Sequence, residues 1–386
     1  MKRTAPPFCP NPLCRLHDRQ QAAEMRGPQG SWYWRKGVRK LKDGRSVQRY
    51  QCTFCHTCFS SRTFSVDYWE KRHLNYRRLL QMLVSCMSQR AIARAFGCSP
   101  KTVENKIGRL TRQAVGVKAA LRAEAMLAED LVADGFESYT VSQYWPNNFH
   151  LLVGKESQFV YYLNYAQLRR KGRMRPWQQE KARRLREEVP LEPAQIRLRF
   201  TELSCELTRL QPRSAGKQRL FLHTDEKKEY AEVLSPLIYG GAAPGKGYRL
   251  IHQRTSGKVP RDSANPLFSV NYLDREIRKD LAEHVRESTR FGRNVNSAVG
   301  RMEVYLFFHN LIKPFRINRA KCLYRTHAEA AGFDTKLLRR LLARCRQERF
   351  FMSHLTLDRH LELVWRRGYS TPGKIFTDPL PQYVFA

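Results

Sequence analysis

Apolar side chains follow different periods in successive parts of the chain, and the changes of period mark its blocks. Residues 1 to about 65 lack helical periodicity and contain strand-like pieces at 31–35 and 47–51. Residues 68–125 switch to apolar positions three or four apart, the period of an amphipathic helix. These positions are Leu74, Leu79, Leu83, Val84, Ile92, Phe96, Val103, Ile107 and Leu110. The pattern predicts a small strand-rich lobe followed by a compact all-α unit.

From Ala128 the pattern becomes strand-like. The segments LAEDLVADG, FHLLVGK and QFVYYLNY are short, apolar and bounded by turn formers, as strands are. A strongly basic helical stretch follows at about 166–216, and QRLFLHTDE then indicates another strand. We therefore expect an α/β core at 126–320 that a basic helical insertion interrupts, and a helical C-terminal region with a tail at 321–386.

Composition points to an anionic partner. The chain has 386 residues, enough for two or three domains, and its 70 Lys and Arg against 35 Asp and Glu give a formal net charge of +35. Such a surplus attracts polyanions, and binding to phosphates would weaken as salt rises. Nucleic acid is the leading partner, with a solvated cationic surface or a ribosome-associated protein as the alternative. A membrane surface is a weaker candidate, because the arginines do not form one amphipathic stripe.

The chain carries no obvious targeting segment. No stretch approaches the run of about 20 apolar residues that a membrane-spanning helix needs, and MKRTAPPFCPNP lacks the apolar core of a signal peptide. We expect a cytoplasmic, nucleoid-associated protein. Its ten cysteines are no disulfide scaffold in a chain of this size, and their clustering near the N-terminus favours metal binding in a reducing compartment.

Two pairs of cysteines could hold one zinc ion. Cys9 and Cys14 form the first pair, and Cys52 and Cys55 form the second within YQCTFCHTCFSSRTFS. Four thiolates make a closed tetrahedral site, which is structural because it leaves no position for substrate. The alternative is that the cysteines are small buried core residues. The wider spacing of the first pair also leaves three substitute ligands open: His17, His56 and Cys58.

The segment SQRAIARAFGCSPKTVENKIGRL carries the marks of two helices joined by a turn. Ser88 can cap the first helix, and Ser99 followed by Pro100 can open the second. The apolar residues of both helices face a shared core, so the second helix keeps a polar outer face. Residues of that face could reach bases or phosphates in a major groove: Lys101, Thr102, Asn105, Lys106 and Arg109. A generic helical hairpin is the alternative.

Single carboxylates at strand ends stand out in this basic chain. Asp134 ends the strand LVAD, and Asp225 ends the strand LFLHTD. If the two strands lie side by side, both carboxylates meet at one edge of a sheet, close enough to share a divalent cation. A third carboxylate from a helix would complete a two-metal site for phosphodiester chemistry.

Glu303, within GRMEVYLFFHNLIKPFRI, is the candidate for the third carboxylate. It shares a helix face with Asn310, and Asn310 or the neighbouring His309 could orient a ligand or a phosphate. Each acid taken alone could instead be an ordinary surface carboxylate or a salt-bridge partner. The main competitors are Glu137, Glu229 and Glu287.

Together these segments resemble the DDE transposases of bacterial insertion sequences that carry an N-terminal zinc ribbon and a helix-turn-helix. The resemblance covers most of the chain and rests on CPNPLC with YQCTFCHTCFSSRTF, on SQRAIARAFGCSPKTV, on VADGFESY, on LHTDEKKEY and on RMEVYLFFHNLIKPFRI. It implies a zinc ribbon at 1–66, an all-α helix-turn-helix domain at 67–125 and a ribonuclease H-like α/β catalytic core at 126–320.

In that core, the resemblance implies two magnesium ions bound by Asp134, Asp225 and Glu303 for DNA cleavage and strand transfer. The partner would be double-stranded DNA, at the element's ends and at the target, and a homo-oligomer would bring two ends together. Further DNA contacts would come from a connecting region: Lys258, Arg261 and Asn265. Two other functions remain open, a catalytically inactive DNA-binding regulator and a metal-dependent nuclease that hydrolyses without joining.

Overall fold

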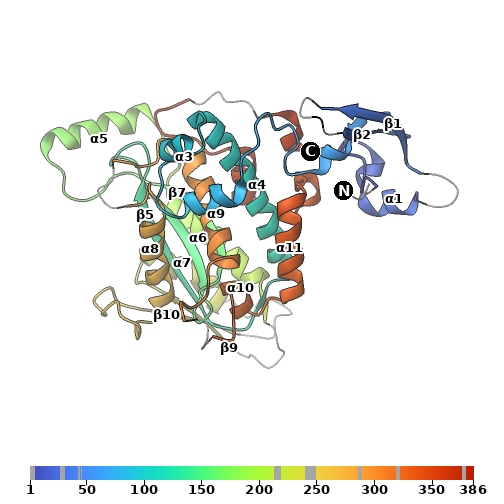
Figure 1. The fold of residues 1–386 in the computed structure, drawn as a ribbon. Helices are drawn as coiled ribbons and strands as arrows, with labels where there is room; N and C mark the ends of the chain where they lie inside the picture. Colours follow the sequence, from blue (N-terminus) through green and yellow to red (C-terminus); the bar gives the residue numbers. More distant parts are fainter. Residues whose placement is uncertain are drawn as a thin grey trace. The chain divides into compact units, whose positions relative to one another are not determined.

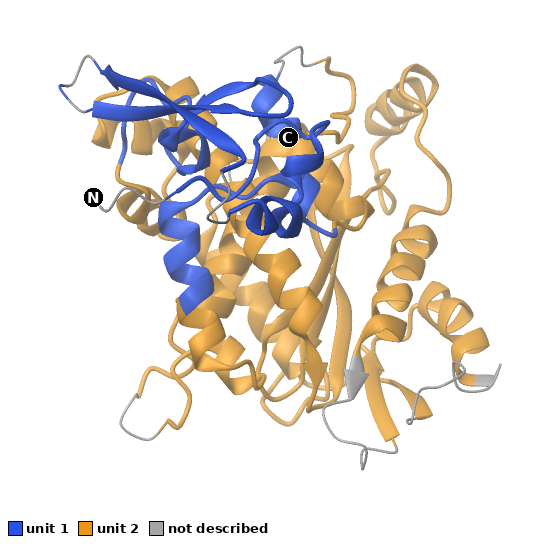
Figure 2. Ribbon diagram, turned by 90° about the vertical axis from the view of Figure 1, so that its right-hand side faces the viewer, with its two compact units in different colours: residues 1–74, 340–356, 378–386 blue, residues 75–339, 357–377 orange. Residues whose placement is uncertain are grey.

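The computed structural model divides the chain into two compact units, which Figure 2 colours separately. Unit 1 comprises residues 1–74, 340–356 and 378–386, and unit 2 comprises residues 75–339 and 357–377. The structure describes residues 5–26, 31–41, 44, 46–212, 219–239, 249–285, 289–318, 322–375 and 380–386. This division differs from the expected blocks, because the helix-turn-helix falls in the same unit as the α/β core.

Unit 1 is built on a three-stranded antiparallel sheet with the order β1-β2-β3. Its strands are β1 (Tyr33–Lys40), β2 (Ser46–Cys52) and β3 (Cys58–Ser60). Short helices accompany the sheet, namely η1 (Arg15–His17), α1 (Arg19–Glu24), η2 (Ser61–Phe64), η4 (Met352–His354) and η5 (Gln382–Phe385). The strand-like pieces expected at 31–35 and 47–51 are confirmed, since β1 and β2 cover most of them.

The core of unit 1 is small and aromatic, and both ends of the chain contribute to it. Phe8, Trp32, Tyr50 and Phe59 are buried around the cysteines, and Phe351 joins them from the C-terminal region. The rings of Phe8 and Phe351 meet edge to face, with 4.9 Å between their centroids. The C-terminal segments therefore complete this lobe, and the separate C-terminal region expected at 321–386 is not what the structure contains.

A five-stranded mixed sheet with the order β10-β9-β5-β6-β7 forms the centre of unit 2. Its strands are β5 (Leu131–Tyr139), β6 (Pro146–Gly154), β7 (Val160–Gln167), β9 (Arg219–Thr224) and β10 (Arg249–Arg254). β5, β6 and β7 pair antiparallel, whereas β9 runs parallel to β5 and β10 runs parallel to β9. The sequence predicts that Asp134 ends its strand, but β5 continues to Tyr139. A second, two-stranded sheet pairs β4 (Met126–Leu127) with β8 (Gln211–Pro212).

Helices surround this sheet (Figure 1). Those of unit 2 are α2 (Tyr76–Leu83), α3 (Gln89–Ala95), α4 (Pro100–Glu124), α5 (Pro176–Glu188), α6 (Gln195–Arg209), α7 (Lys228–Tyr239), α8 (Phe268–Asp280), α9 (Val295–Leu311), α10 (His327–Ala330) and α12 (Arg359–Arg366). α11 (Thr335–Gln347) runs from unit 2 into unit 1. No helix in the described ranges combines the length and the apolar composition needed to cross a membrane.

Helices cover both faces of the sheet. Successive side chains of a strand point to opposite faces, so neighbouring residues report on different helices. On one face, the ring of His150 lies against Phe200 of α6 and Tyr230 of α7. On the other face, the ring of Phe136 lies beneath the guanidinium of Arg278, which α8 supplies. The site described below lies at β5 and β9, where α7 and α8 both approach the sheet.

The helix-turn-helix continues directly into the body of unit 2. Ser88 caps α3 and Ser99 caps α4, as expected, through their hydroxyl groups. α4 is far longer than a recognition helix requires, and its second half packs along α9. Thr111 of α4 donates a hydrogen bond to the carbonyl of Gly300 over 3.1 Å, and the missing side chain at Gly300 permits this close approach. This packing explains why the two expected domains form one unit.

The segment expected to be a basic insertion has two different parts. α6 is a core element, because its residues Phe200, Leu203 and Leu207 are buried against the sheet and α7. α5 contains no buried residue, and Figure 1 shows it extending away from the sheet. Only the part around α5 therefore has the character of an insertion, since removing α6 would expose one face of the sheet.

Gly135 follows Asp134 and tests how tightly this part of the sheet is packed. A methyl group at this position would overlap the side-chain amide of Asn148, which is fully buried. We expect Gly135→Ala to lower the free energy of unfolding by about 1–3 kcal/mol, as overpacking usually does. Gly257→Ala is the control, because nothing lies within 4 Å of the added carbon there. Urea denaturation measures both variants. Equal losses in the free energy of unfolding would contradict this packing.

Candidate functional site

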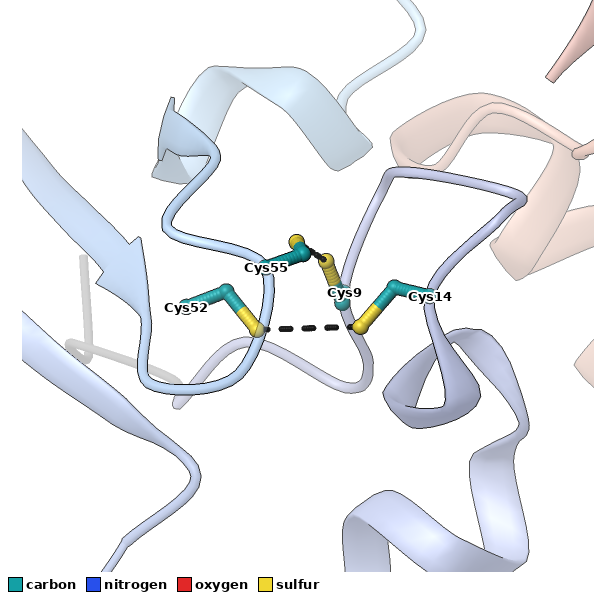
Figure 3. A group of neighbouring side chains, drawn as sticks. All are labelled: Cys9, Cys14, Cys52 and Cys55. Atoms are coloured by element: carbon teal, nitrogen blue, oxygen red, sulfur yellow. Dashed lines mark hydrogen bonds between the residues drawn. The ribbon is translucent and has the colours of Figure 1, made fainter.

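The four cysteines predicted to bind zinc come together in unit 1 (Figure 3). Their Sγ atoms all lie within 4.8 Å of one another, with 3.5 Å between Cys9 and Cys55 and 3.8 Å between Cys14 and Cys52. Zinc–sulfur bonds of about 2.3 Å in a tetrahedron place the sulfur atoms at about this separation. The cluster could therefore hold zinc or a similar structural metal, and the wide spacing of the first pair does not prevent it.

The substitute ligands lie outside this cluster. His17 uses its two ring nitrogens for the carbonyl of Cys9, at 2.7 Å, and for the hydroxyl of Ser353, at 2.6 Å. Cys58 is exposed and His56 does not belong to the group. Within the cluster, burial would raise the pKa of Cys55, but hydrogen bonds led by those with Thr57 lower it to about 6. Burial raises the pKa of Cys14 to about 11 and that of Cys9 further, so a metal would displace protons from these thiols on binding.

The predicted DNA-contact residues on α4 do not all lie on its outer face. Lys101 and Asn105 are exposed, and Thr102 and Arg109 are partly exposed. Lys106 is buried, with 4% of its surface accessible, and its ammonium lies 5.9 Å from the ring centre of Tyr76. The prediction is therefore wrong in placing Lys106 on the outer face, because its position points it toward α2.

The two aspartates predicted to meet at the sheet do so. β5 and β9 are adjacent and parallel, and their register pairs Val132 with His223, so that Asp134 lies beside Asp225, the residue after β9. Both carboxylates contact the ammonium of Lys227, with 3.5 Å from Nζ to Oδ1 of Asp134 and 3.3 Å to Oδ2 of Asp225. Each of the three side chains is about one quarter accessible or less. The expected pair of strand-end carboxylates is thus brought together around a lysine.

Electrostatic effects at this pair oppose one another. Burial raises the pKa of Asp134, the nearby Asp225 raises it further, and Lys227 acts in the opposite direction. Burial would lower the pKa of Lys227, but Tyr230 and the two aspartates raise it above its ordinary value. Lys227 is therefore an ammonium at neutral pH, and it partly compensates two carboxylates that would otherwise repel each other.

A third carboxylate, Asp274 of α8, lies close enough to the pair for the charge of Asp134 to act on it, and no sequence motif indicated it. Burial and then the charge of Asp134 raise the pKa of Asp274 to about 7, against the effects of Arg278 and Arg261. Its Oδ1 atom is buried and accepts no hydrogen bond from the residues that the structure describes. Its position in the sequence could have indicated a buried acid, because Asp274 lies on the same helix face as the buried Val270 and Ile277.

Glu303, the predicted third acid, occupies a different place. It lies on α9 with 1% of its side chain accessible, and both carboxylate oxygens accept from Lys118 of α4, at 2.8 and 3.0 Å. His360 of α12 donates to Oε1 over 3.0 Å. Burial would raise the pKa of Glu303, but Lys118 and His360 lower it to about 2. The structure therefore does not bring Glu303 to the two aspartates. Its carboxylate instead links α9 to α4 and α12 through Lys118 and His360.

Other predicted contacts also have structural partners. Asn310 exchanges two 3.0 Å hydrogen bonds with the backbone of Val160, and His309 donates to the carbonyl of Gln158. Both buried side chains thus hold the backbone at the start of β7. Asn265 is buried and donates to the carbonyl of Pro260.

The remaining candidates have mixed positions. Lys258 and Arg261 are exposed, and Arg261 is close enough to affect Asp274. Among the competing acids, Glu137 is exposed and acts on Lys227, and Glu229 is partly exposed in the first turn of α7. Glu287 lies outside the described residues.

No protein-family model matches the chain, and no curated protein matches it either.

Metal removal should unfold the lobe that contains the four cysteines. We expect Cys52→Ser to lose bound zinc and to expose β2 to rapid hydrogen exchange, because the binding energy of a structural zinc is folding energy, about 10 kcal/mol or more. Cys58→Ser is the matched control, since Cys58 is exposed and not in the cluster. Metal analysis and hydrogen exchange of residues 46–60 check both variants. Equal zinc content in the two variants would exclude Cys52 as a ligand.

Glu303 should matter for stability more than for metal binding. We expect Glu303→Gln to lower the free energy of unfolding by about 3–5 kcal/mol, because it leaves the ammonium of Lys118 with a neutral partner in a buried position. Glu362→Gln is the control, because that carboxylate is about half exposed and pairs only with Arg366 among the described salt bridges. Chemical denaturation measures both. A Glu303→Gln variant that is as stable as the native chain would contradict the structural role.

Proposed function

We propose that the chain is a metal-dependent DNA transposase of the DDE kind, and that its catalytic carboxylates are Asp134, Asp225 and Asp274. The observation that carries this proposal is the meeting of two aspartates at neighbouring parallel strands, with a third, from α8, close enough to feel the charge of Asp134. Asp274 takes the role first expected of Glu303. The sheet order is compatible with the ribonuclease H-like core that the sequence resemblance implies, although other mixed α/β folds also fit it.

The donor set suits magnesium. Mg²⁺ prefers carboxylate oxygens, and the unpartnered Oδ1 atom of Asp274 offers an oxygen that no described residue of the protein uses. When bound, two such ions would activate an attacking hydroxyl and stabilise the leaving oxygen of a phosphodiester. The chain itself would hold the ligands in place, because Asp134 is fixed within β5, Asp225 by the end of β9 and Asp274 by α8.

DNA as the substrate is supported by features outside the carboxylates. The net charge of +35 favours a polyanion, and α3 with the first half of α4 has the capped geometry of a helix-turn-helix. The exposed Lys101 and Asn105 of α4 would contact bases or phosphates. Arg261, exposed and close to Asp274, would contact the DNA near the carboxylates. A homo-oligomer would hold two element ends, and the cysteine lobe would add a second contact surface.

Cleavage of DNA that carries the element's own ends tests the proposal. We expect Asp134→Asn, Asp225→Asn and Asp274→Asn each to reduce Mg²⁺-dependent cleavage about 1000-fold or more, because each removes several kcal/mol of transition-state stabilisation. Glu226→Gln is the matched control, an exposed carboxylate next to Asp225. End binding, measured by gel shift, should survive in all four variants.

The DNA products of this assay distinguish transposition from the two alternative functions. Joined strands support transposition, and hydrolysed ends alone indicate a nuclease with the same site. Specific binding without cleavage by the native chain, in Mg²⁺ or Mn²⁺, would replace the proposal with a DNA-binding regulator. Full activity of Asp274→Asn would remove that residue from the site and return Glu303 to consideration.

A further inference from the structure

We propose that Lys227 is a built-in counter-ion of the carboxylate site, which takes the position of a divalent cation and must move away when the cation binds. The inference rests on the proposed function, because it assigns a regulating residue to the same site. Lys227 would thereby lower the affinity of the site for metal and hold the carboxylates in place before metal arrives.

The geometry of the lysine suggests this competition. Its Nζ atom lies 3.5 Å from Oδ1 of Asp134 and 3.3 Å from Oδ2 of Asp225, so one ammonium bridges the two side chains. The backbone N–H of Lys227 also donates to Oδ1 of Asp225 over 3.1 Å, which fixes the start of the side chain beside the site. A magnesium ion binds carboxylate oxygens at about 2.0–2.1 Å. An ion between these two aspartates would therefore lie very close to the ammonium, and like charges at such a distance repel strongly.

The spacing of the carboxylates agrees with a bridging lysine. In the part of the chain that the structure describes, the four thiols of unit 1 are the only group of three or more metal-ligand side chains whose donor atoms all lie within 4.8 Å of one another. Asp134, Asp225 and Asp274 do not meet that condition. An ammonium holds oxygens farther apart than a divalent cation does. Metal binding by all three acids would therefore require their donor atoms to move closer together, with Lys227 displaced from between Asp134 and Asp225.

The charge balance explains why the site would still bind metal. Asp134 and Asp225 share one lysine, the charge of Asp134 also acts on the nearby Asp274, and burial makes each additional negative charge more costly. A divalent cation relieves this repulsion better than one ammonium does. Removing Lys227 should therefore increase the gain from metal binding, because no competing cation remains.

Lys228 provides a matched control. It carries the same charge on the next residue, but its side chain is 87% exposed and its ammonium pairs with Glu232 at 3.6 Å. Replacing either lysine changes the net charge of the protein equally. Only Lys227 contacts the aspartates, so a difference between the two variants reports on direct competition.

The test is Mn²⁺ binding to the zinc-loaded full chain without DNA, measured by isothermal titration and by the electron paramagnetic resonance signal of free Mn²⁺. We expect Lys227→Met to bind Mn²⁺ at least about tenfold more tightly than the native chain, within the usual range for coupling between two sites. Lys228→Met should match the native affinity, and Lys227→Arg, which keeps the charge, should stay close to it. If Lys227→Met does not fold, Lys227→Gln replaces it.

Two negative outcomes lead to different conclusions. Equal or weaker Mn²⁺ affinity of Lys227→Met, in a protein whose native form binds Mn²⁺ and whose Asp225→Asn variant does not, would overturn the role of Lys227 and leave the carboxylate site intact. Absence of Mn²⁺ binding in all variants, including Lys227→Met, would overturn both the role of Lys227 and the metal site of the proposed function.

Discussion

The parallel pairing of β9 with β5 determines where the proposed carboxylate site lies in unit 2. Adjacent parallel strands keep their residues in register, so the partnership of Val132 with His223 places Asp134 next to Asp225, although the two are far apart in the sequence. The rest of the site follows from this pairing. α7 begins at Lys228, just after Asp225, which brings Lys227 to the same position. β10 then extends the sheet, and α8 returns across the face that carries Phe136 and delivers Asp274.

Sequence patterns could predict the parts of this arrangement that depend on local chemistry. Helix caps at Ser88 and Ser99, the strands of the α/β core and the cysteine pairs all have local signals, and the structure contains each of them. The third acid depends on tertiary contacts. Glu303 and Asp274 both lie on helices with buried neighbours, and the sequence does not reveal that Glu303 forms an ion pair with Lys118 and a hydrogen bond with His360. The wrong prediction for Lys106 has the same cause. Its position on the helix predicted an outer, polar face, but a tertiary contact with Tyr76 of α2 buries it.

The boundaries of the units could not be predicted from the sequence for a related reason. A core can be completed by segments that are distant in sequence, and no local pattern reports this. Phe351 packs against Phe8, and the His17 side chain contacts Ser353, so the cysteine lobe depends on residues from the far end of the chain. A lobe of this size buries little apolar surface for its length. The C-terminal segments enlarge that small core, and a metal, which the four cysteines could hold, would stabilise it further.

Carboxylates without full compensation are unusual in a chain with two basic residues for each acidic one. Two other buried acids of unit 2 are paired with cationic side chains. Glu206 accepts hydrogen bonds from both Arg122 and Arg209, and Glu303 accepts them from Lys118. Asp134 and Asp225 instead share one lysine, and Asp274 keeps an unpartnered oxygen among the described residues. A shortage of cations cannot explain this difference. The divalent cation of the proposed function would relieve the repulsion between these acids, which the single lysine compensates only in part.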